Sequence, residues 1–124
     1  MTAKKILLIE DEPDILKTTL AFLESEGFKV MIATDGLVGL QMARSESPDL
    51  IVMDIMLSKL DGYKLCRMLK FDEKYKHIPI IFFTARAQES DQRMGREVCA
   101  DAYIMKPFEP QILMEKINLL LKNG

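Results

Sequence analysis

Five residues with charged or hydroxyl side chains stand at the ends of short apolar runs: Glu10, Asp11, Asp54, Thr84 and Lys106. If these run ends meet in the fold, three carboxylates come together. Carboxylates about 4 Å apart repel each other by roughly 4 kcal/mol at an effective dielectric of 20, so such a cluster needs a cation. Carboxylate oxygens in a pocket open to water suit Mg²⁺, which also keeps bound waters and accepts phosphate oxygens as ligands.

The same group of residues favours phosphoryl transfer. The Lys106 ammonium group is a compact point charge suited to a phosphate or carboxylate oxygen, and the Thr84 hydroxyl can donate to a phosphoryl oxygen. A carboxylate nucleophile forms an aspartyl phosphate, and this transfer needs mainly charge neutralisation and alignment of the attacking and leaving oxygens. Asp54 is the expected nucleophile, because it ends a run that we expect to be the central strand.

These residues can act together only if the elements around them form one sheet. Short apolar runs alternate five times with longer segments of helical period, which is typical of a parallel sheet with crossover helices. We expect strands at Lys5–Glu10, Phe28–Ala33, Leu50–Asp54, Pro79–Thr84 and Ala102–Met105, and helices at Pro13–Glu26, Leu37–Arg44, Gly62–Lys70, Glu89–Val98 and Pro110–Lys122.

Strand composition predicts the order within the sheet. The first, third and fourth strands are continuous apolar runs, as expected of strands covered on both faces. The second strand contains Lys29 and the fifth is short, so both belong at the edges. Right-handed crossovers then favour a flavodoxin-like, doubly wound α/β fold with the order 2-1-3-4-5 and five helices on both faces. Its order reverses between strands one and three, where ligands bind beyond the carboxyl ends.

Composition excludes several other classes of protein. The 124 residues suffice for one domain, and the net charge of −2 shows no basic excess, which argues against nucleic acid or an anionic membrane as a direct partner. No run resembles a signal peptide or a membrane span, so we expect a cytoplasmic protein. The two cysteines lack metal-ligand spacing and are expected to be buried thiols. The nine methionines are expected to fill the core.

Four segments resemble the receiver domain of two-component (phosphorelay) response regulators: Ile9–Asp14, Ile51–Leu57 with Asp61-Gly62, Phe83–Arg86 and Tyr103–Phe108. The match runs in order and with similar spacing over essentially the whole chain. It implies a single receiver domain over residues 1–124, and because the last helix reaches almost to the final residue we expect no output domain. The chain would be a stand-alone regulator or a receiver excised from a larger one.

The resemblance implies a role for each residue of the acidic group. Asp54 would be the phosphoacceptor. The metal ligands would be Asp11 directly, Glu10 through water, Asp54 itself and the backbone carbonyl of Met56. The ion would be Mg²⁺, for which Mn²⁺ could substitute. Glu10 stands where aspartate is commoner in the family, and Ser58 stands where proline is usual.

Further roles follow from the resemblance on the phosphoryl side. Thr84, the backbone of Ala85 and Lys106 would bind the phosphoryl group. Thr84 and Tyr103 would form the switch pair that remodels the surface of helix four, strand five and helix five, although a tyrosine on an edge strand also fits plain packing. The resemblance also implies that Met56 and Arg86 tune the lifetime of the aspartyl phosphate. The peptide bond between Lys106 and Pro107 would be cis.

The leading hypothesis is a phosphorylation-dependent switch. A sensor histidine kinase or histidine phosphotransfer protein would donate the phosphoryl group, and the altered surface would control a downstream protein. The chain would catalyse only its own phosphorylation and slow self-dephosphorylation, as a monomer or a phosphorylation-favoured homodimer. The alternative is a phosphorylation-independent interaction module with the same fold. A hydrolase passing through an aspartyl phosphate would usually have a second acid two residues beyond the nucleophile, where this chain has Met56.

Overall fold

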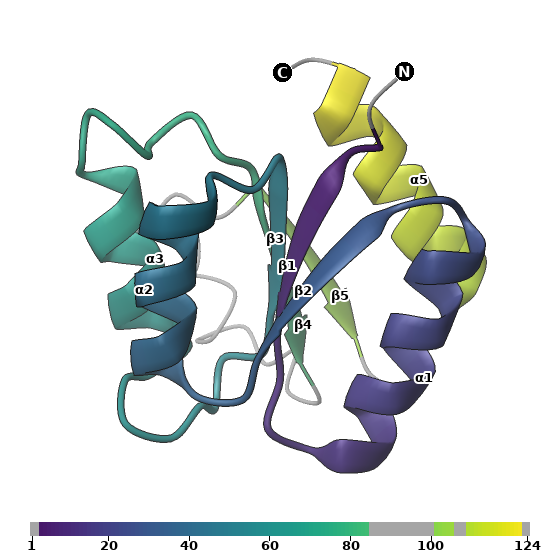
Figure 1. Cartoon of the computed structure of the whole chain (residues 1–124), viewed down its shortest axis with the longest axis horizontal. Helices are drawn as coiled ribbons and strands as arrows, with labels where there is room; N and C mark the ends of the chain where they lie inside the picture. Colours follow the sequence, from purple (N-terminus) through teal and green to yellow (C-terminus); the bar gives the residue numbers. More distant parts are fainter. Residues whose placement is uncertain (1–2, 85–100, 106–108, 123–124) are drawn as a thin grey trace.

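The structure, a computed structural model, describes residues 3–84, 101–105 and 109–122. A central sheet lies between two helical layers, with α2 and α3 on one face and α1 and α5 on the other (Figure 1). The elements are β1 (Lys5–Ile9), α1 (Pro13–Ser25), β2 (Lys29–Ala33), α2 (Gly36–Glu46), β3 (Leu50–Met53), α3 (Gly62–Lys70), β4 (Ile80–Thr84), β5 (Ala102–Met105) and α5 (Pro110–Lys122). The predicted helix at Glu89–Val98 lies outside the described residues.

All strand pairs are parallel, and the order is β2-β1-β3-β4-β5. The predicted fold class and strand order are therefore confirmed. Lys29 is exposed on the edge strand β2, in agreement with the reasoning that placed this strand at an edge. In the centre of the sheet, Met53 of β3 lies opposite both Ile9 of β1 and Phe82 of β4.

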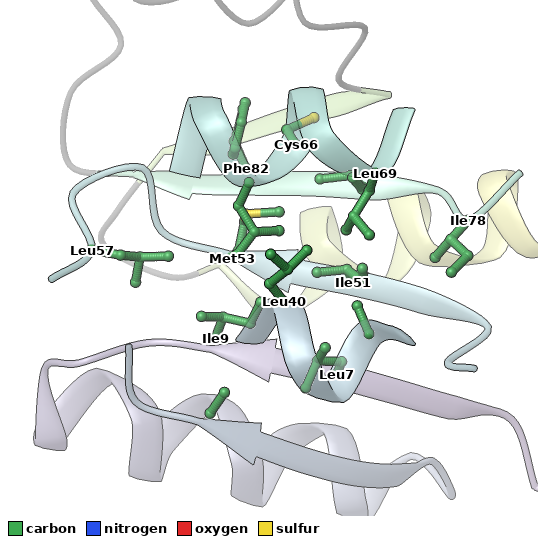
Figure 2. Packing of buried hydrophobic residues seen from close by; sticks show 14 of the residues in the cluster. Leu7, Ile9, Leu40, Ile51, Met53, Leu57, Cys66, Leu69, Ile78 and Phe82 are labelled. Atoms are coloured by element: carbon green, nitrogen blue, oxygen red, sulfur yellow. The ribbon is translucent and has the colours of Figure 1, made fainter. Parts of the chain in front are cut away.

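Alternation along the strands divides the core into two halves. Residues such as Ile9, Met53 and Phe82 point toward α2 and α3, where they pack with Leu40 and Cys66 (Figure 2). Their neighbours along each strand point the other way and pack against α1 and α5: Ile6, Leu8, Leu50, Val52, Ile81 and Phe83. Each fully buried side chain of this kind contributes about 1.5–3 kcal/mol. Burial on both faces explains why the inner strands are apolar throughout.

Helix boundaries follow from local chemistry. The Asp35 carboxylate accepts a hydrogen bond from the Val38 amide at 2.8 Å and starts α2, which therefore begins one residue before the predicted helix at Leu37–Arg44. Glu12 occupies the capping position of α1 but its side chain makes no capping bond. The positive φ of 92° at Gly27, just after α1, is a conformation that glycine adopts at little cost.

The two ends of the described chain lie at the same edge of the sheet. β1 begins and α5 ends at the upper edge in Figure 1, whereas the loops that follow β1 and β3 lie at the lower edge. The carboxyl ends of the parallel strands therefore share the lower edge. Among the described residues, no helix has the length and apolar character required to span a membrane.

Candidate functional site

Three acidic side chains meet at the carboxyl edge of the sheet. Oxygen atoms of the Glu10, Asp11 and Asp54 carboxylates all lie within 4.8 Å of one another. Glu10 and Asp54 directly follow the neighbouring strands β1 and β3, each of which ends one residue before the predicted strand end. The Asp54 amide donates to the Ile9 carbonyl at 3.1 Å, and the Glu10 amide donates to the Ala33 carbonyl at 3.0 Å. This extension of the strand pairing fixes the two acids side by side.

Two of the three acids are largely removed from solvent. Glu10 is 1% exposed and Asp54 is 8% exposed, whereas Asp11 is exposed. A backbone amide donates to each buried carboxylate: Glu12 to Glu10 Oε2 at 3.1 Å, and Met56 to Asp54 Oδ1 at 3.3 Å. Neutral amide donors such as these offset only part of the cost of bringing like charges together. The cluster is thus suited to a positive ion approaching from the side of Asp11.

The donor set determines which kind of ion fits. The cluster offers carboxylate oxygens, with no sulfur or imidazole among its members. Hard dications such as Mg²⁺ prefer such ligands and retain waters that an exposed position like that of Asp11 can accommodate. The residues present therefore fit the Mg²⁺ ion expected from the sequence.

The loop between β3 and α3 is held in place by two glycines. A Cβ on Gly62 would lie 2.6 Å from the Asp54 carbonyl oxygen and 2.8 Å from the Ile55 Cα, while the Gly62 amide donates to the Ile55 carbonyl at 2.8 Å. A Cβ on Gly36 would overlap the Leu60 carbonyl oxygen. Only glycine allows the starts of α3 and α2 to approach this loop so closely, which fixes the backbone that leaves Asp54.

Of these two glycines, Gly62 was expected only as part of the Asp61-Gly62 motif, and Gly36 was not expected to matter. The signal available was the repeated Asp-Gly pair at 35–36 and 61–62, because each aspartate caps the helix that its glycine begins. Asp35 accepts from Val38, and Asp61 Oδ1 accepts from the Lys64 amide at 3.0 Å. A salt bridge of 3.7 Å between Lys59 and Asp35 also links this loop to α2.

The predicted switch residues lie on β4, the neighbour of β3, and on the edge strand β5. Thr84 is the last residue of β4 and pairs in register with Met105, the last residue of β5. Tyr103 is half-buried, and its ring centroid lies 5.4 Å from that of Phe82, which in turn lies 5.4 Å from that of Tyr63. The Tyr103 ring is therefore packed in a row of aromatic rings on the α3 side of the sheet.

The remaining predicted site residues are placed only in part. Met56 lies in the loop after β3, where its amide donates to Asp54 Oδ1 and its side chain is exposed. Ala85, Arg86, Lys106 and Pro107 lie outside the described residues. Met105, the last residue of β5 and the residue before Lys106 in the sequence, lies at the same edge of the sheet as Asp54.

Comparison with known proteins gives one consistent family. Residues 6–118 match the model of the response regulator receiver domain. The Bacillus subtilis alkaline phosphatase synthesis transcriptional regulatory protein PhoP is 40% identical over 121 residues, which cover 98% of this chain and 50% of that protein. The chain spans about half the length of the curated relatives it matches.

Solved structures agree with the sequence relatives. A CheY-like receiver domain protein from Methanospirillum hungatei JF-1 is 33% identical, with a TM-score of 0.91 over 98% of this chain and 96% of that one. The receiver domain of a Pseudomonas aeruginosa PAO1 sensor histidine kinase is 30% identical, with a TM-score of 0.91 over 98% of this chain and 99% of that one. That structure holds a magnesium ion in its active site cleft.

Proposed function

The chain belongs to the response regulator receiver domain family, and we propose that within it Asp54 accepts a phosphoryl group in a reaction that requires a bound divalent cation. The observation that carries this proposal is the approach of three carboxylates to within 4.8 Å at the carboxyl edge of the sheet. Three carboxylates this close repel one another, so a positive ion beside them would stabilise the cluster, and a phosphoryl group bound to that ion would lie next to Asp54.

The acid cluster supplies the ligands for the cation. Asp11 and Asp54 would bind Mg²⁺ directly, the backbone carbonyl of Met56 would be a further ligand, and Glu10 would act through water. Mn²⁺, which accepts the same oxygen ligands, would substitute. When bound, the ion supplies neutralisation of the negative charge on the incoming phosphoryl group. The near-complete burial of Glu10 beside exposed Asp11 supports this division between an inner and an outer acid.

Asp54 itself would carry out the covalent step. One of its carboxylate oxygens would attack the phosphorus atom of a phosphohistidine, so that an O–P bond forms while the P–N bond breaks and the bond electrons return to the imidazole ring. The Met56 amide, bonded to Asp54 Oδ1 at 3.3 Å, would hold the carboxylate plane for in-line attack. The backbone constraints at Gly62 support this, because they fix the direction in which the chain leaves Asp54.

The phosphoryl oxygens would be bound on the side of β4 and β5. We propose Thr84, the backbone amide of Ala85 and Lys106 for this role, with Thr84 and Tyr103 as the switch pair, Met56 and Arg86 as residues that tune the lifetime of the aspartyl phosphate, and a cis Lys106–Pro107 bond. The register of Thr84 with Met105 supports the first assignment, since it brings the ends of β4 and β5 to one level at the carboxyl edge of the sheet.

The proposed partners follow from this chemistry. A sensor histidine kinase or histidine phosphotransfer protein would donate the phosphoryl group, and the altered surface around β5 and α5 would control a target protein in the cytoplasm. The curated relatives are named as transcriptional regulators, and one of them as DNA-binding. Because this chain matches about half of each, we propose that any contact with DNA in such proteins belongs to a part beyond the receiver.

Mass spectrometry after incubation with acetyl phosphate and MgCl₂ tests the proposal. We expect the protein to gain the mass of one phosphoryl group, and the gain to disappear in Asp54→Asn and when EDTA removes the cation. Asp14→Asn, which changes an exposed acid on α1 outside the cluster, should be phosphorylated like the original chain. Phosphorylation that persists in Asp54→Asn would exclude Asp54 as the acceptor, and phosphorylation in EDTA would exclude the requirement for a cation.

A further inference from the structure

Helix α3 presents a continuous exposed stripe that the phosphorylation site does not use. Lys64, Arg67, Met68 and Phe71, the residue that ends the helix, are all exposed. Their spacing of i, i+3, i+4 and i+7 places them on one face. The opposite face is formed by Leu65, Cys66 and Leu69, which are fully buried. The stripe is therefore the outer surface of a helix whose inner surface is already covered.

Two large apolar side chains lie in this stripe. Phe71 is 69% exposed, the highest value among the large apolar residues that the structure describes, and Met68, one turn earlier, is 41% exposed. Single exposed apolar residues are common and need no explanation. Phenylalanine, methionine and arginine together, however, are the residues enriched at the centres of protein interfaces. Met68 and Phe71, with Arg67 next to them, match this composition.

The charge of the stripe differs from that of the whole chain. The chain has a net charge of −2, yet α3 contains three cationic residues, Lys64, Arg67 and Lys70, and no acid. Lys70 is paired with Asp101, whereas neither Lys64 nor Arg67 forms an ion pair with any residue the structure describes. Arg44, in the last turn of the neighbouring helix α2, is also exposed. The outer face of this layer thus favours an acidic partner.

The stripe is separate from the functional elements already assigned. α3 lies in the layer with α2 on one face of the sheet, while α5 lies on the other face (Figure 1). Its first residues lie beside the acid cluster, and Phe71 lies at the other end of the helix, toward the edge where β1 begins. A partner bound here would leave both Asp54 and the β5–α5 surface accessible.

We propose that this stripe binds an acidic amphipathic helix of a partner protein. Apolar side chains of that helix would cover Met68 and Phe71, and carboxylates beside them would pair with Lys64 and Arg67. Nucleic acid is disfavoured because two or three cations neutralise few phosphates and the apolar pair would be left without a contact. A membrane surface is disfavoured because stable attachment needs a much larger apolar area. The binding does not depend on phosphorylation of Asp54.

The test uses a synthetic helical peptide of about 18 residues, or five turns, with leucines at i, i+3, i+4 and i+7 and glutamates on the flanking positions. Added to the isotopically labelled full chain, it should shift amide resonances of residues 62–74 selectively, and the shifts should weaken at high salt. A peptide with lysine in place of glutamate should not bind. Phe71→Ser and Arg67→Glu should each weaken binding by about tenfold, since each removes roughly the free energy of one buried side chain or one charged pair.

Matched controls distinguish binding at this surface from nonspecific binding to exposed apolar side chains. Leu119 on α5 is 55% exposed, so Leu119→Ser removes a comparable apolar group elsewhere and should leave peptide affinity unchanged. Phosphoryl uptake and the far-ultraviolet spectrum of Phe71→Ser should match those of the original chain, because the residue is outside the site and the core. Asp54→Asn should bind the peptide normally, so that failure of the phosphorylation proposal would be distinguished from failure of this one.

Several results would overturn the proposal. These are the absence of localised shifts, equal binding of the lysine peptide, and weaker binding in Leu119→Ser than in Phe71→Ser. Vesicles of anionic lipid and a short DNA duplex are tested in the same way. If either shifts the resonances of residues 62–74 and the acidic peptide does not, the stripe binds another class of partner. Concentration-dependent dimerisation abolished by Phe71→Ser would assign it to a second copy of the chain.

Discussion

The Lys70 ammonium group lies 2.8 Å from Asp101 Oδ2, which joins the last turn of α3 to the residue before β5. Lys70 Nζ also donates to the Ile78 carbonyl at 2.7 Å, and the same Asp101 oxygen accepts the Ile80 amide at 2.8 Å. The Lys70 side chain is only 8% exposed. One ion pair thus connects α3, the loop after it and the beginnings of β4 and β5.

Replacing Lys70 should therefore destabilise the fold. Lys70→Met keeps the apolar stem but leaves Asp101 and the Ile78 carbonyl without the ammonium donor. Breaking a buried pair costs about 3–5 kcal/mol, and because the Asp101 side chain is 32% exposed we expect a loss of about 1–3 kcal/mol in urea unfolding. Lys76→Met, which breaks an exposed pair with Glu73, should change stability by less than about 1 kcal/mol. Equal effects of the two variants would show that the Lys70 pair has no special role.

Asp54→Asn should stabilise the folded chain when divalent cations are absent. The substitution removes one charge from a cluster whose oxygens lie within 4.8 Å, and relief of this repulsion should raise the free energy of unfolding by about 1–2 kcal/mol. Thermal unfolding in EDTA measures the change. Asp14→Asn, an exposed acid outside the cluster, should have an effect within about 0.5 kcal/mol. A destabilised Asp54→Asn variant would contradict the idea that repulsion dominates at this position.

Mg²⁺ should stabilise the original chain and have little effect on Asp11→Asn. An ion that binds only the folded state adds about 1.4 kcal/mol when its concentration is tenfold above its dissociation constant. Asp11 is the exposed member of the cluster, so its replacement weakens ion binding without opening the core. Unfolding followed over a MgCl₂ titration gives the comparison. Stabilisation of equal size in both proteins would place the ion elsewhere.

Gly62→Ala should impair both folding and phosphoryl uptake. The added Cβ would lie 2.6 Å from the Asp54 carbonyl oxygen, and because backbone atoms cannot yield as a side-chain tip can, we expect a loss of about 1–3 kcal/mol. Gly39→Ala is the matched control, since its Cβ would meet the Cδ1 tip of Ile9 at 2.6 Å. Gly39→Ala should retain phosphorylation by acetyl phosphate. Normal phosphorylation of Gly62→Ala would show that the loop after Asp54 tolerates displacement.

Phosphorylation should change the surroundings of the Tyr103 ring. The chain contains three tyrosines, so fluorotyrosine labelling gives three fluorine resonances, of which Tyr103→Phe removes one. If Tyr103 is a switch residue, its resonance should shift when Asp54 is phosphorylated, because its packing against Phe82 would be rearranged. The Tyr75 resonance serves as the reference. If mass spectrometry shows that the chain is phosphorylated and the Tyr103 resonance is unchanged, Tyr103 has a role in packing only.

The sheet and its acidic edge could be predicted because both depend on local patterns. Continuous apolar runs indicate buried parallel strands, and the acids that end those runs must meet at one edge once the order is known. Whether a single residue is buried or exposed was harder to predict from the sequence. The nine methionines were expected in the core, and for Met56, Met68 and Met105 this was wrong, because each is exposed. Met68 shares the helical face of Lys64, which was the signal that it points outward.

Long-range polar contacts could not be predicted from the sequence at all. Lys70 and Asp101 were individually indistinguishable from the other charged residues of the chain. Their pairing arises only because α3 ends close to the start of β5, a relation that depends on the lengths and tilts of elements between them. The Asp35-Gly36 pair signals the start of a helix, but the close contact that excludes a side chain at 36 was similarly hidden, since the atom involved belongs to Leu60.

The hydrogen bond between the Asp54 amide and the Ile9 carbonyl also bears on how this protein is made. Between Glu10 and Asp54 along the chain lie α1, β2, α2 and β3, so no nascent chain can assemble the cation site until β3 has left the ribosome and docked against β1. Binding of an ion at this site therefore requires that β1 and β3, which are synthesised at different times, have already paired. Amide protons of β1 and β3 should accordingly exchange more slowly with solvent deuterium when the ion is supplied.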